Sequence, residues 1–324
     1  MSRRSFCRAS IAVLIAPGIA LAQPATRVRR IGLLAPFDSG PDPDDYVEPL
    51  RKLGWTEGKN IVTDRRITNG VDGLSRAADE LVRLKVDLIL ANGTDAALAA
   101  KAATTTIPIV MLGAGDPVGM GIVASLSHPG GNITGYSMAG PEIASKRASL
   151  MHELVPAARR VAIIVDPSRR ISPNVGRTSE AAYRSLGVTP VVIEGPLSGP
   201  ANLADALTQA ARLQAQAVEI TGDVLSLEEA TRAMEPARRY RLAVATADWE
   251  LVQGGALLYF DGHYEDQASR VAAIIDKVLR GARPADVPIE QPTRFYLGIN
   301  LKAARALGIT VPQSLLLRAD EVIQ

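Results

Sequence analysis

The segment VDLILANGTDAALAAKAATTTIPIVMLGAGDPVG, residues 86–119, joins a short apolar run, an alanine-rich stretch and a second apolar run. Each apolar run, 86–91 and 107–112, has the length of a strand, and both are apolar with little alternation, which is typical of strands covered on both faces. The stretch between them, 94–104, favours a helix. The segment therefore predicts a strand–helix–strand unit of a parallel sheet.

The same alternation continues in both directions from this unit. Before residue 138 we expect strands at 31–35, 60–67, 86–91, 107–112 and 132–137, and helices at 46–54, 74–84, 94–104 and 119–126. After residue 138 we expect strands at 161–166, 188–194, 217–222, 242–247 and 256–260, and helices at 142–155, 175–186, 201–213 and 227–240, the last broken or kinked at Pro236. Two such runs predict two α/β lobes.

The tail differs from these two runs. A long helix carries Tyr264, Ala268, Val271, Ile275 and Val278 on one face, and the proline-rich connector 281–292 leads to one further strand and closing helices. We infer that the chain recrosses between the lobes here and forms a two- or three-strand hinge. The predicted fold class is α/β, with two doubly wound parallel-sheet lobes joined by a multi-strand hinge. Lobe 1 comprises 28–138 and about 261–290, and lobe 2 comprises 139–260 and about 291–324.

The first 22 residues have the features of an export signal. Arg3, Arg4 and Arg8 precede an apolar run at 9–20, and Ala20-Leu21-Ala22 forms an A-x-A cleavage site. Arg3-Arg4 also resembles a twin-arginine signal, and the Sec and twin-arginine routes both stay open. We therefore expect an exported, periplasmic protein with a cleaved signal peptide at 1–22.

Charge and cysteine content narrow the class of protein. The chain has 36 basic and 34 acidic side chains, and removal of the three signal arginines leaves 33 against 34. This balance argues against nucleic-acid binding, which usually needs a basic excess. The single cysteine, Cys7, lies in the signal, so the exported chain has no disulfide, thiol nucleophile or cysteine-ligated metal.

Catalytic and metal motifs are missing from the sequence. The three histidines, His128, His152 and His263, are far apart and form no H-x-x-H pair, and neither a G-x-S-x-G elbow nor a P-loop occurs. The loop GAGDPVG differs by one residue from the dinucleotide fingerprint, follows the fourth strand rather than the first, and has Pro117 where an N–H should face phosphate. We expect no catalytic residue, no metal and no cofactor.

Small polar residues gather instead in the loops that follow the predicted strands, where open α/β sheets bind ligands. Thr94 stands at a helix start, where it caps the helix, meets an anionic ligand group, or does both. Asp223 suits a ligand ammonium or is a solvated loop acid, and Phe37, Trp249 and Tyr259 suit stacking. The candidate ligand-binding residues are Phe37, Asp38, Ser39, Asn92, Gly93, Thr94, Gly113, Gly115, Asp116, Ser168, Asp223, Asp248, Trp249 and Tyr259.

Four segments carry a resemblance to a known family: LGWTEGKNI (53–61), the stretch 77–112, GDPVGMGIVASLSHPGGNITG (115–135) and the tail 274–323. Over about 28–324 the chain resembles ABC-transporter substrate-binding proteins with a periplasmic-binding-protein class I fold. The resemblance implies a protein that closes its lobes on a small molecule, such as an amino acid or an aromatic or other carboxylate-bearing solute. It also implies Thr94 at the ligand carboxylate, Gly115 and Asp116 on the same lobe, and Asp223 opposite.

The chain departs from the family pattern at several positions. Asp95 follows Gly-Thr where relatives usually have proline, the loop PFDSGPDPDDY (36–46) is unusually acidic, and Arg169 and Arg170 stand where small or amide residues are usual. The segment LLYFDG (257–262) replaces a tyrosine–glycine turn. Asp95 and the two arginines contact either the ligand or the opposite lobe, so amino-acid specificity does not carry over from the resemblance.

We expect an extracytoplasmic, non-enzymatic solute-binding protein of an ABC importer. Its partners are a small-molecule ligand and the ABC permease with its ATPase, the permease docking directly; we expect no nucleic-acid partner and a monomer. Two alternatives stay open: a two-lobed enzyme that uses a nucleotide donor, and a ligand-sensing receptor module of the same fold.

Overall fold

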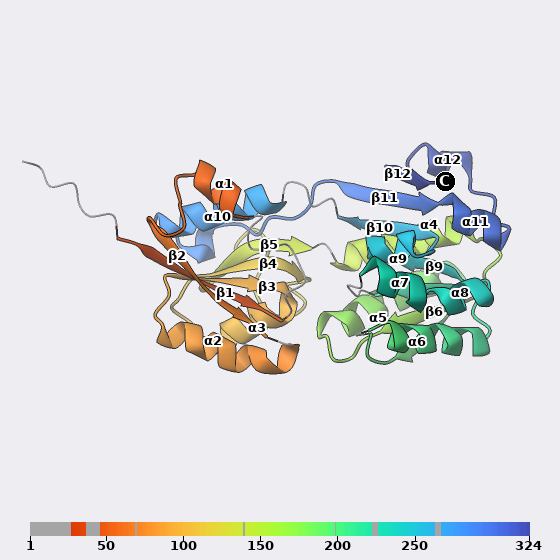
Figure 1. Ribbon diagram of the computed structural model, residues 1–324, viewed down its shortest axis with the longest axis horizontal. Helices are drawn as coiled ribbons and strands as arrows, with labels where there is room; N and C mark the ends of the chain where they lie inside the picture. The colour runs from red at the N-terminus through yellow and green to blue at the C-terminus, as the bar shows by residue number, and fades with distance from the viewer. Residues whose placement is uncertain are drawn as a thin grey trace, which may run out of the picture.

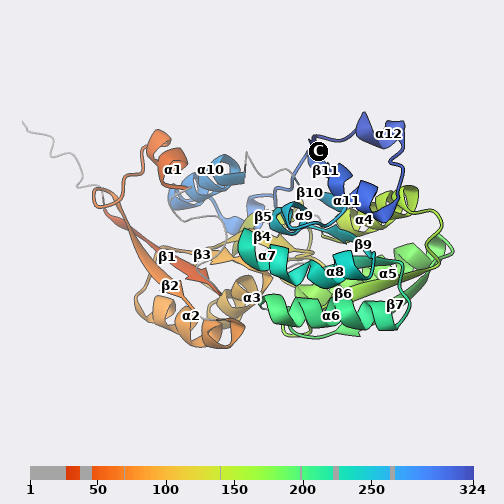
Figure 2. The same ribbon diagram turned by 45° about the vertical axis from the view of Figure 1, so that its right-hand side comes forward.

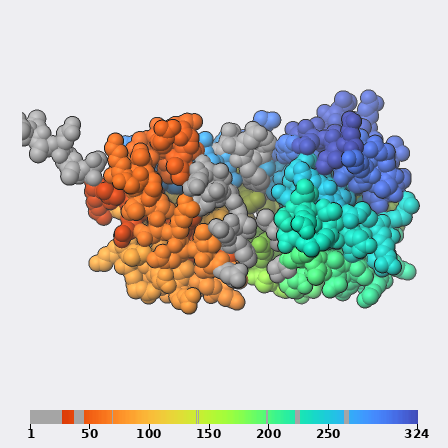
Figure 3. Space-filling model, viewed as in Figure 1, coloured from red at the N-terminus to blue at the C-terminus, as the bar shows by residue number. Residues whose placement is uncertain are grey.

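Two sheets form the cores of two lobes that lie side by side along the long axis of the molecule (Figure 1). The structure is a computed structural model, and it describes residues 27–36, 46–68, 70–138, 140–197, 199–221, 226–262 and 267–324. In the space-filling view, red and orange residues cover most of one lobe, and green, teal and dark blue residues cover most of the other, while light blue residues from late in the chain lie on the first lobe (Figure 3).

The sheet of lobe 1 is entirely parallel, with the order β2-β1-β3-β4-β5. Its strands are β1 (Arg29–Ala35), β2 (Ile61–Ile67), β3 (Leu88–Asn92), β4 (Ile109–Gly115) and β5 (Ile133–Met138). The helices of this lobe are α1 (Val47–Lys52), α2 (Leu74–Arg83), α3 (Gly93–Ala103) and α10 (Gln267–Leu279), with 3-10 turns at Val71–Gly73 and Pro284–Asp286.

Helices cover both faces of this sheet. In two views α2 and α3 lie on one face and α1 and α10 on the other (Figures 1 and 2). The expected face of α2 is confirmed, because Leu74, Ala77, Ala78 and Leu81 are all buried. α10 comes from late in the sequence but packs on β4 and β5, with Val271 and Ile275 fully buried. The chain therefore returns to lobe 1 after it has built most of lobe 2.

The sheet of lobe 2 has the order β12-β11-β10-β9-β8-β6-β7. Its strands are β6 (Arg160–Val165), β7 (Thr189–Glu194), β8 (Ala217–Ile220), β9 (Ala243–Thr246), β10 (Leu258–Gly262), β11 (Phe295–Asn300) and β12 (Glu321–Ile323). The helices are α4 (Gly140–Leu154), α5 (Ile171–Ser185), α6 (Pro200–Arg212), α7 (Leu227–Ala233), α8 (Glu235–Arg239), α9 (Trp249–Gln253), α11 (Leu301–Leu307) and α12 (Gln313–Leu316).

Three features of the fold differ from the sequence expectations. The stretch 119–126 forms turns rather than a helix, because Gly121 has a φ of +66° while Ile122 and Val123 pack into the core from a turn. The tail holds two strands rather than one, and β11 runs antiparallel to β10 because it returns from lobe 1. α5 begins at Ile171 instead of 175, with Pro173 in its first turn, where proline is tolerated.

Other local expectations are confirmed. The helix expected over 227–240 is broken near Pro236: α7 ends at Ala233, and α8 begins at Glu235 with the proline in its first turn. The connector after α10 runs beside β5, where the Ser137 amide donates to the Glu290 carbonyl over 2.8 Å. The chain passes between the lobes three times, after β5, after β10 and before β11.

Candidate functional site

The carboxyl ends of β3 and β4 bring Thr94 and Gly115 together in lobe 1. The Gly115 amide donates to Thr94 Oγ1 over 3.0 Å, and Thr94 is only 5% exposed. The interpretation of Thr94 as an N-cap is wrong, because α3 begins at Gly93 with Asn92 at its N-cap position. The Thr94 hydroxyl therefore serves a neighbouring strand end rather than its own helix.

The proton of this hydroxyl is available to a further group. A threonine hydroxyl has one donor hydrogen and two acceptor lone pairs, and Thr94 uses an acceptor position for Gly115. Among the described residues the Thr94 hydroxyl donates no hydrogen bond. Thr94 can thus donate to a ligand oxygen at the edge of the sheet.

β4 contains a bulge close to the segments that connect the lobes. Its pairing with β5 shifts between Leu112 and Ala114, and Gly113 has a φ of +66°, which glycine adopts readily. A Cβ at Gly113 would lie 3.5 Å from Met138 Sδ and 3.6 Å from Gln267 Nε2. Gly113 therefore lies on the hinge side of this edge.

Lobe 2 meets lobe 1 through the first turn of α5. Asn174 Nδ2 donates to Asp116 Oδ2 over 2.6 Å, and a Cβ built on Gly115 would lie 2.8 Å from Ile171 Cγ1. Asp95 and Arg170 also face each other across the lobes, with 3.8 Å between Oδ1 and Nε. This answers part of the question that the sequence left open, because the Asp95–Arg170 pair is a contact between the lobes.

The Asp95 carboxylate is poorly compensated in this arrangement. Its side chain is 15% exposed, whereas that of Arg170 is 68% exposed. Burial raises the pKa of the Asp95 carboxyl, and the positive charge of Arg170 offsets only part of this effect. The contact between the lobes therefore leaves a partly desolvated acid beside the first turn of α3 and the start of α5.

The loop after β6 is organised around a buried acid, Asp166. Its Oδ1 accepts from both the amide and the hydroxyl of Ser168, at 2.9 and 2.6 Å, and its Oδ2 accepts from the Leu197 amide at 3.0 Å. Ser168 is itself exposed, and its hydroxyl proton is used within the loop. In this structure the Ser168 hydroxyl is thus engaged within its own loop.

Asp248, Trp249 and Tyr259 lie together at the start of α9 and on the neighbouring strand β10. Asp248 caps α9, because its Oδ1 accepts from the Leu251 amide at 3.2 Å. The Trp249 ring packs edge-on against Tyr259 at 5.4 Å and against Tyr296 at 5.9 Å between ring centroids. Such edge-to-face contacts hold the rings in place. Burial raises the pKa of the Tyr259 phenol, and the negative charge of nearby Asp261 raises it further. The phenol therefore stays neutral.

Four candidate residues, Phe37, Asp38, Ser39 and Asp223, lie outside the described residues. Among the others, the structure brings Thr94, Gly115 and Asp116 together, and separately groups Asp248, Trp249 and Tyr259. Sequence reasoning missed Ile171, Asn174 and Tyr296 as individual residues. Asn174 lies between the expected strand 161–166 and the expected helix 175–186, so only its polar side chain after a strand end could have drawn attention to it.

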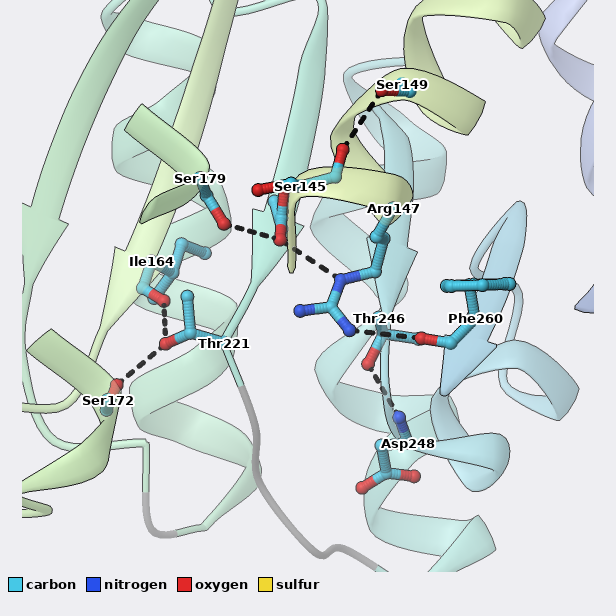
Figure 4. Close-up of polar contacts among 11 residues, drawn as sticks. Ser145, Arg147, Ser149, Ile164, Ser172, Ser179, Thr221, Thr246, Asp248 and Phe260 are labelled. Carbon is cyan, nitrogen blue, oxygen red and sulfur yellow. Dashed lines mark hydrogen bonds and ion pairs between the residues drawn. The ribbon is translucent and has the colours of Figure 1, made fainter. Parts of the chain in front are cut away.

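The sequence analysis also missed a buried ion pair inside lobe 2. Arg147 of α4 donates through Nε to Glu219 Oε1 of β8 at 3.1 Å, and the two side chains are 3% and 0% exposed (Figure 4). Arg147 donates again to the Phe260 carbonyl, and Ser179 donates to the same Glu219 oxygen at 2.8 Å. Burial and the adjacent Glu219 charge raise the pKa of the Tyr183 phenol well above its usual range.

Two features are absent from the described residues. No helix in the described ranges is long and apolar enough to cross a bilayer. Within the same ranges, no three histidine, cysteine, aspartate or glutamate side chains gather in a way that would suit a metal ion.

Residues 45–323 match the family described as ABC transporter substrate binding protein. The chain belongs to this family. The tyrosine-binding protein of Clostridioides difficile (strain R20291) is 26% identical over 265 residues, which cover 82% of this chain and 75% of that protein. The structure of an ABC domain in complex with L-Trp from Streptococcus pneumonia superposes with a TM-score of 0.80 at 25% identity, over 91% of this chain and 100% of the other.

The fold is that of type I periplasmic binding proteins. The leucine binding protein LivK from Thermotoga maritima superposes with a TM-score of 0.58 at 16% identity, over 79% of this chain and 77% of that chain. Members of the family bind small molecules for ABC transporters outside the cytoplasm, and the relatives are substrate-binding proteins rather than enzymes. The family match therefore favours solute binding over the nucleotide-donor enzyme.

Removal of one partner of the buried ion pair should destabilise lobe 2 strongly. Arg147→Met leaves the Glu219 carboxylate buried without its cation, and we expect a loss of about 3–5 kcal/mol in the free energy of unfolding, measured with urea. The double variant Arg147→Met/Glu219→Met removes both charges and should recover most of this loss. A loss below about 1 kcal/mol in the single variant would contradict the ion-pair account.

The raised pKa of Asp95 should make the free energy of unfolding depend on pH. Because its pKa is raised on folding, its favourable contribution is present below the unfolded pKa and is lost as pH rises through the folded pKa. Asp95→Asn should therefore be more stable than the parent at pH 7, by less than about 1 kcal/mol because the site is partly exposed.

This advantage should shrink as the pH falls through the carboxyl range, as urea titrations at pH 7 and in mild acid would show. Arg170→Gln is the companion variant: it removes the cation that lowers the Asp95 pKa, and should reduce stability at pH 7. An Asp95→Asn variant that lost stability at pH 7 and regained it in acid would reverse the expected sign.

Proposed function

We propose that this protein binds an aromatic amino acid, or a similar small carboxylate-bearing solute, between its two lobes and closes on it. The observation that carries the proposal is the contact between the strand ends of the two lobes, where Asn174 bonds Asp116 and Ile171 approaches Gly115. Type I folds of this kind close like a hinge around their ligands. The relatives named for tyrosine and for L-Trp support the solute class.

Thr94 is the residue that we assign to the ligand carboxylate. It is buried, lies in the first turn of α3 and has a hydroxyl proton without an acceptor among the described residues. The exposed guanidinium of Arg170 adds a positive charge on the opposite lobe. A solute carboxylate in this position would receive a hydrogen bond from one lobe and be attracted by a charge on the other.

Trp249, Tyr259 and Tyr296 form the aromatic wall that we assign to the solute side chain. The three rings lie within 6.0 Å of one another between centroids and come from α9, β10 and β11. A rigid aromatic cluster offers apolar area at low entropic cost. Asp248 and Gly113 complete our proposed binding region, on lobe 2 and on the hinge side of lobe 1.

The proposal includes the cellular context. Residues 1–22 direct export to the periplasm and are cleaved, and the protein then acts as a monomer that docks directly on the permease of an ABC importer. Lobe 1 comprises 28–138 and about 261–290, and lobe 2 comprises 139–260 and about 291–324. The packing of α10 on the first sheet and the pairing of β11 with the second support this division.

A solute panel tests the proposal. L-Tyrosine and L-tryptophan should raise the melting temperature, because a ligand that binds only the folded state stabilises it. Tyramine lacks the carboxylate and 3-(4-hydroxyphenyl)propionate lacks the ammonium group, so these two probes report which group the protein reads. We expect 3-(4-hydroxyphenyl)propionate to bind more tightly than tyramine. A panel without any stabilising carboxylate would contradict the proposal.

Thr94→Val should weaken binding of the stabilising solute by about 1–3 kcal/mol in calorimetry, the cost of an unsatisfied buried polar partner. Thr94→Ser is the matched control, because it keeps the hydroxyl and should bind within a few-fold of the parent. An unchanged dissociation constant in Thr94→Val would remove Thr94 from the site.

A further inference from the structure

The first turn of α5 presents two side chains to lobe 1. Ile171 and Asn174 are three residues apart and therefore share one face of the helix. Ile171 faces Gly115, and Asn174 faces Asp116, the next residue along the chain. Two consecutive residues of lobe 1 are thus matched by one face of a helix from lobe 2.

Gly115 is crowded only from the opposite lobe. A Cβ there would lie 2.8 Å from Ile171 Cγ1 and 2.9 Å from Ile171 Cδ1, both closer than real Cβ atoms approach. The nearest atom of lobe 1 itself is Thr94 Oγ1, at 3.9 Å, and the backbone of Gly115 is not in the left-handed region. The requirement for glycine at 115 therefore comes from the approach of lobe 2.

Contacts within lobe 1 hold the Asp116 carboxylate in position for its bond to Asn174. Its φ of +42° lies in the left-handed region, which aspartate tolerates better than most residues. Its Oδ1 accepts from the Gly119 amide at 2.9 Å, which leaves Oδ2 to accept from Asn174 at 2.6 Å. Arg177 donates to Asn174 Oδ1 at 3.2 Å and so orients the amide. The bond between the lobes is charge-assisted and has fixed geometry on both sides.

The turn that carries Ile171 and Asn174 is itself anchored within lobe 2. Ser172 is 1% exposed, and its hydroxyl accepts from the Asp166 amide and lies 2.7 Å from Thr221 Oγ1, which donates to the Ile164 carbonyl (Figure 4). Because the Thr221 hydroxyl donates its only proton to the Ile164 carbonyl, the Ser172 hydroxyl must be the donor in its bond to Thr221. This chain of bonds joins α5 to the ends of β6 and β8.

We propose that Gly115, Ile171 and Asn174 form a seat that fixes how closely the lobes approach, and thereby sets solute affinity without contacting the solute. Gly115 and Ile171 set the distance, and Asn174 fastens the contact through Asp116. The inference rests on the proposed function in one respect, namely that closure serves solute capture. Its test therefore measures closure itself, in the absence of any solute.

The test uses a cross-link between Asp95→Cys and Arg170→Cys, whose parent side chains approach to 3.8 Å across the lobes. The one native cysteine, Cys7, lies within residues 1–22, so the protein without this segment gives a clean background. The rate of intramolecular cross-linking by a short bismaleimide then reports how often the lobes close. Adding Gly115→Ala should slow this rate several-fold, because Ile171 must shift to admit the new methyl group.

Two further variants and a control make the test specific. Gly115→Ala/Ile171→Ala removes the colliding atoms and should restore the rate to within about twofold of the parent, and Asn174→Leu should slow the rate several-fold by removing the donor. Arg184→Gln is the control, because Arg184 lies on α5 but pairs with Glu180 of the same helix. The unfolding midpoint of Gly115→Ala should match that of the parent.

Slower cross-linking in Gly115→Ala with recovery in the double variant would support the seat. An unchanged rate in Gly115→Ala, a failure of Ile171→Ala to restore it, or no cross-linking in the cysteine parent would each overturn it. L-Tryptophan binding provides a separate measurement: its affinity should fall in Gly115→Ala by the same factor as the closure rate. If the cross-linking results are as expected and no solute binds, the proposed function is wrong. The role of the seat in fixing how closely the lobes approach is then still supported.

Discussion

The approach of Ile171 to Gly115 is the constraint on which the relation between the lobes depends. With no Cβ at 115, the first turn of α5 rests against the end of β4. The Asn174–Asp116 bond can form only at that separation, and so can the weaker contact between Asp95 and Arg170. The carboxyl ends of two sheets, where α/β proteins place their ligands, thus come to face each other at a defined distance.

Closure combines a favourable and an unfavourable electrostatic contribution. The Asn174–Asp116 bond has good geometry and stabilises the contact, whereas the buried Asp95 carboxylate is only partly compensated by an exposed arginine. A protein that captures and releases a solute needs a closed state that is accessible but only moderately stable on its own. The opposing contributions around α3 and α5 fit that requirement, with the solute supplying the remaining stabilisation.

Most of the fold could be predicted because it follows from local patterns. The buried face of α2 and the break near Pro236 rest on spacing and on proline geometry within single elements. The helix expected at 119–126 is wrong, because the backbone turns at Gly121. β12 was missed because three residues are too few to give a pattern.

The site was predicted less completely, since its contacts join residues that are distant in sequence. Thr94 was expected at the site from its place after a strand, but its bond to Gly115 spans 21 residues, and no local rule gives that partner. The roles of Ile171 and Asn174 arise only when one lobe docks on the other. Arg147 and Glu219 are 72 residues apart, and their burial follows from the packing of α4 on the sheet of lobe 2, against β9 and β10.

Small-angle X-ray scattering of the protein, with and without a solute that calorimetry shows to bind, tests the central claim most directly. The account predicts that the radius of gyration falls on saturation, as the lobes close onto the seat at Gly115. Saturable binding with an unchanged radius of gyration and an unchanged scattering profile would contradict it, because the solute would then bind without lobe closure.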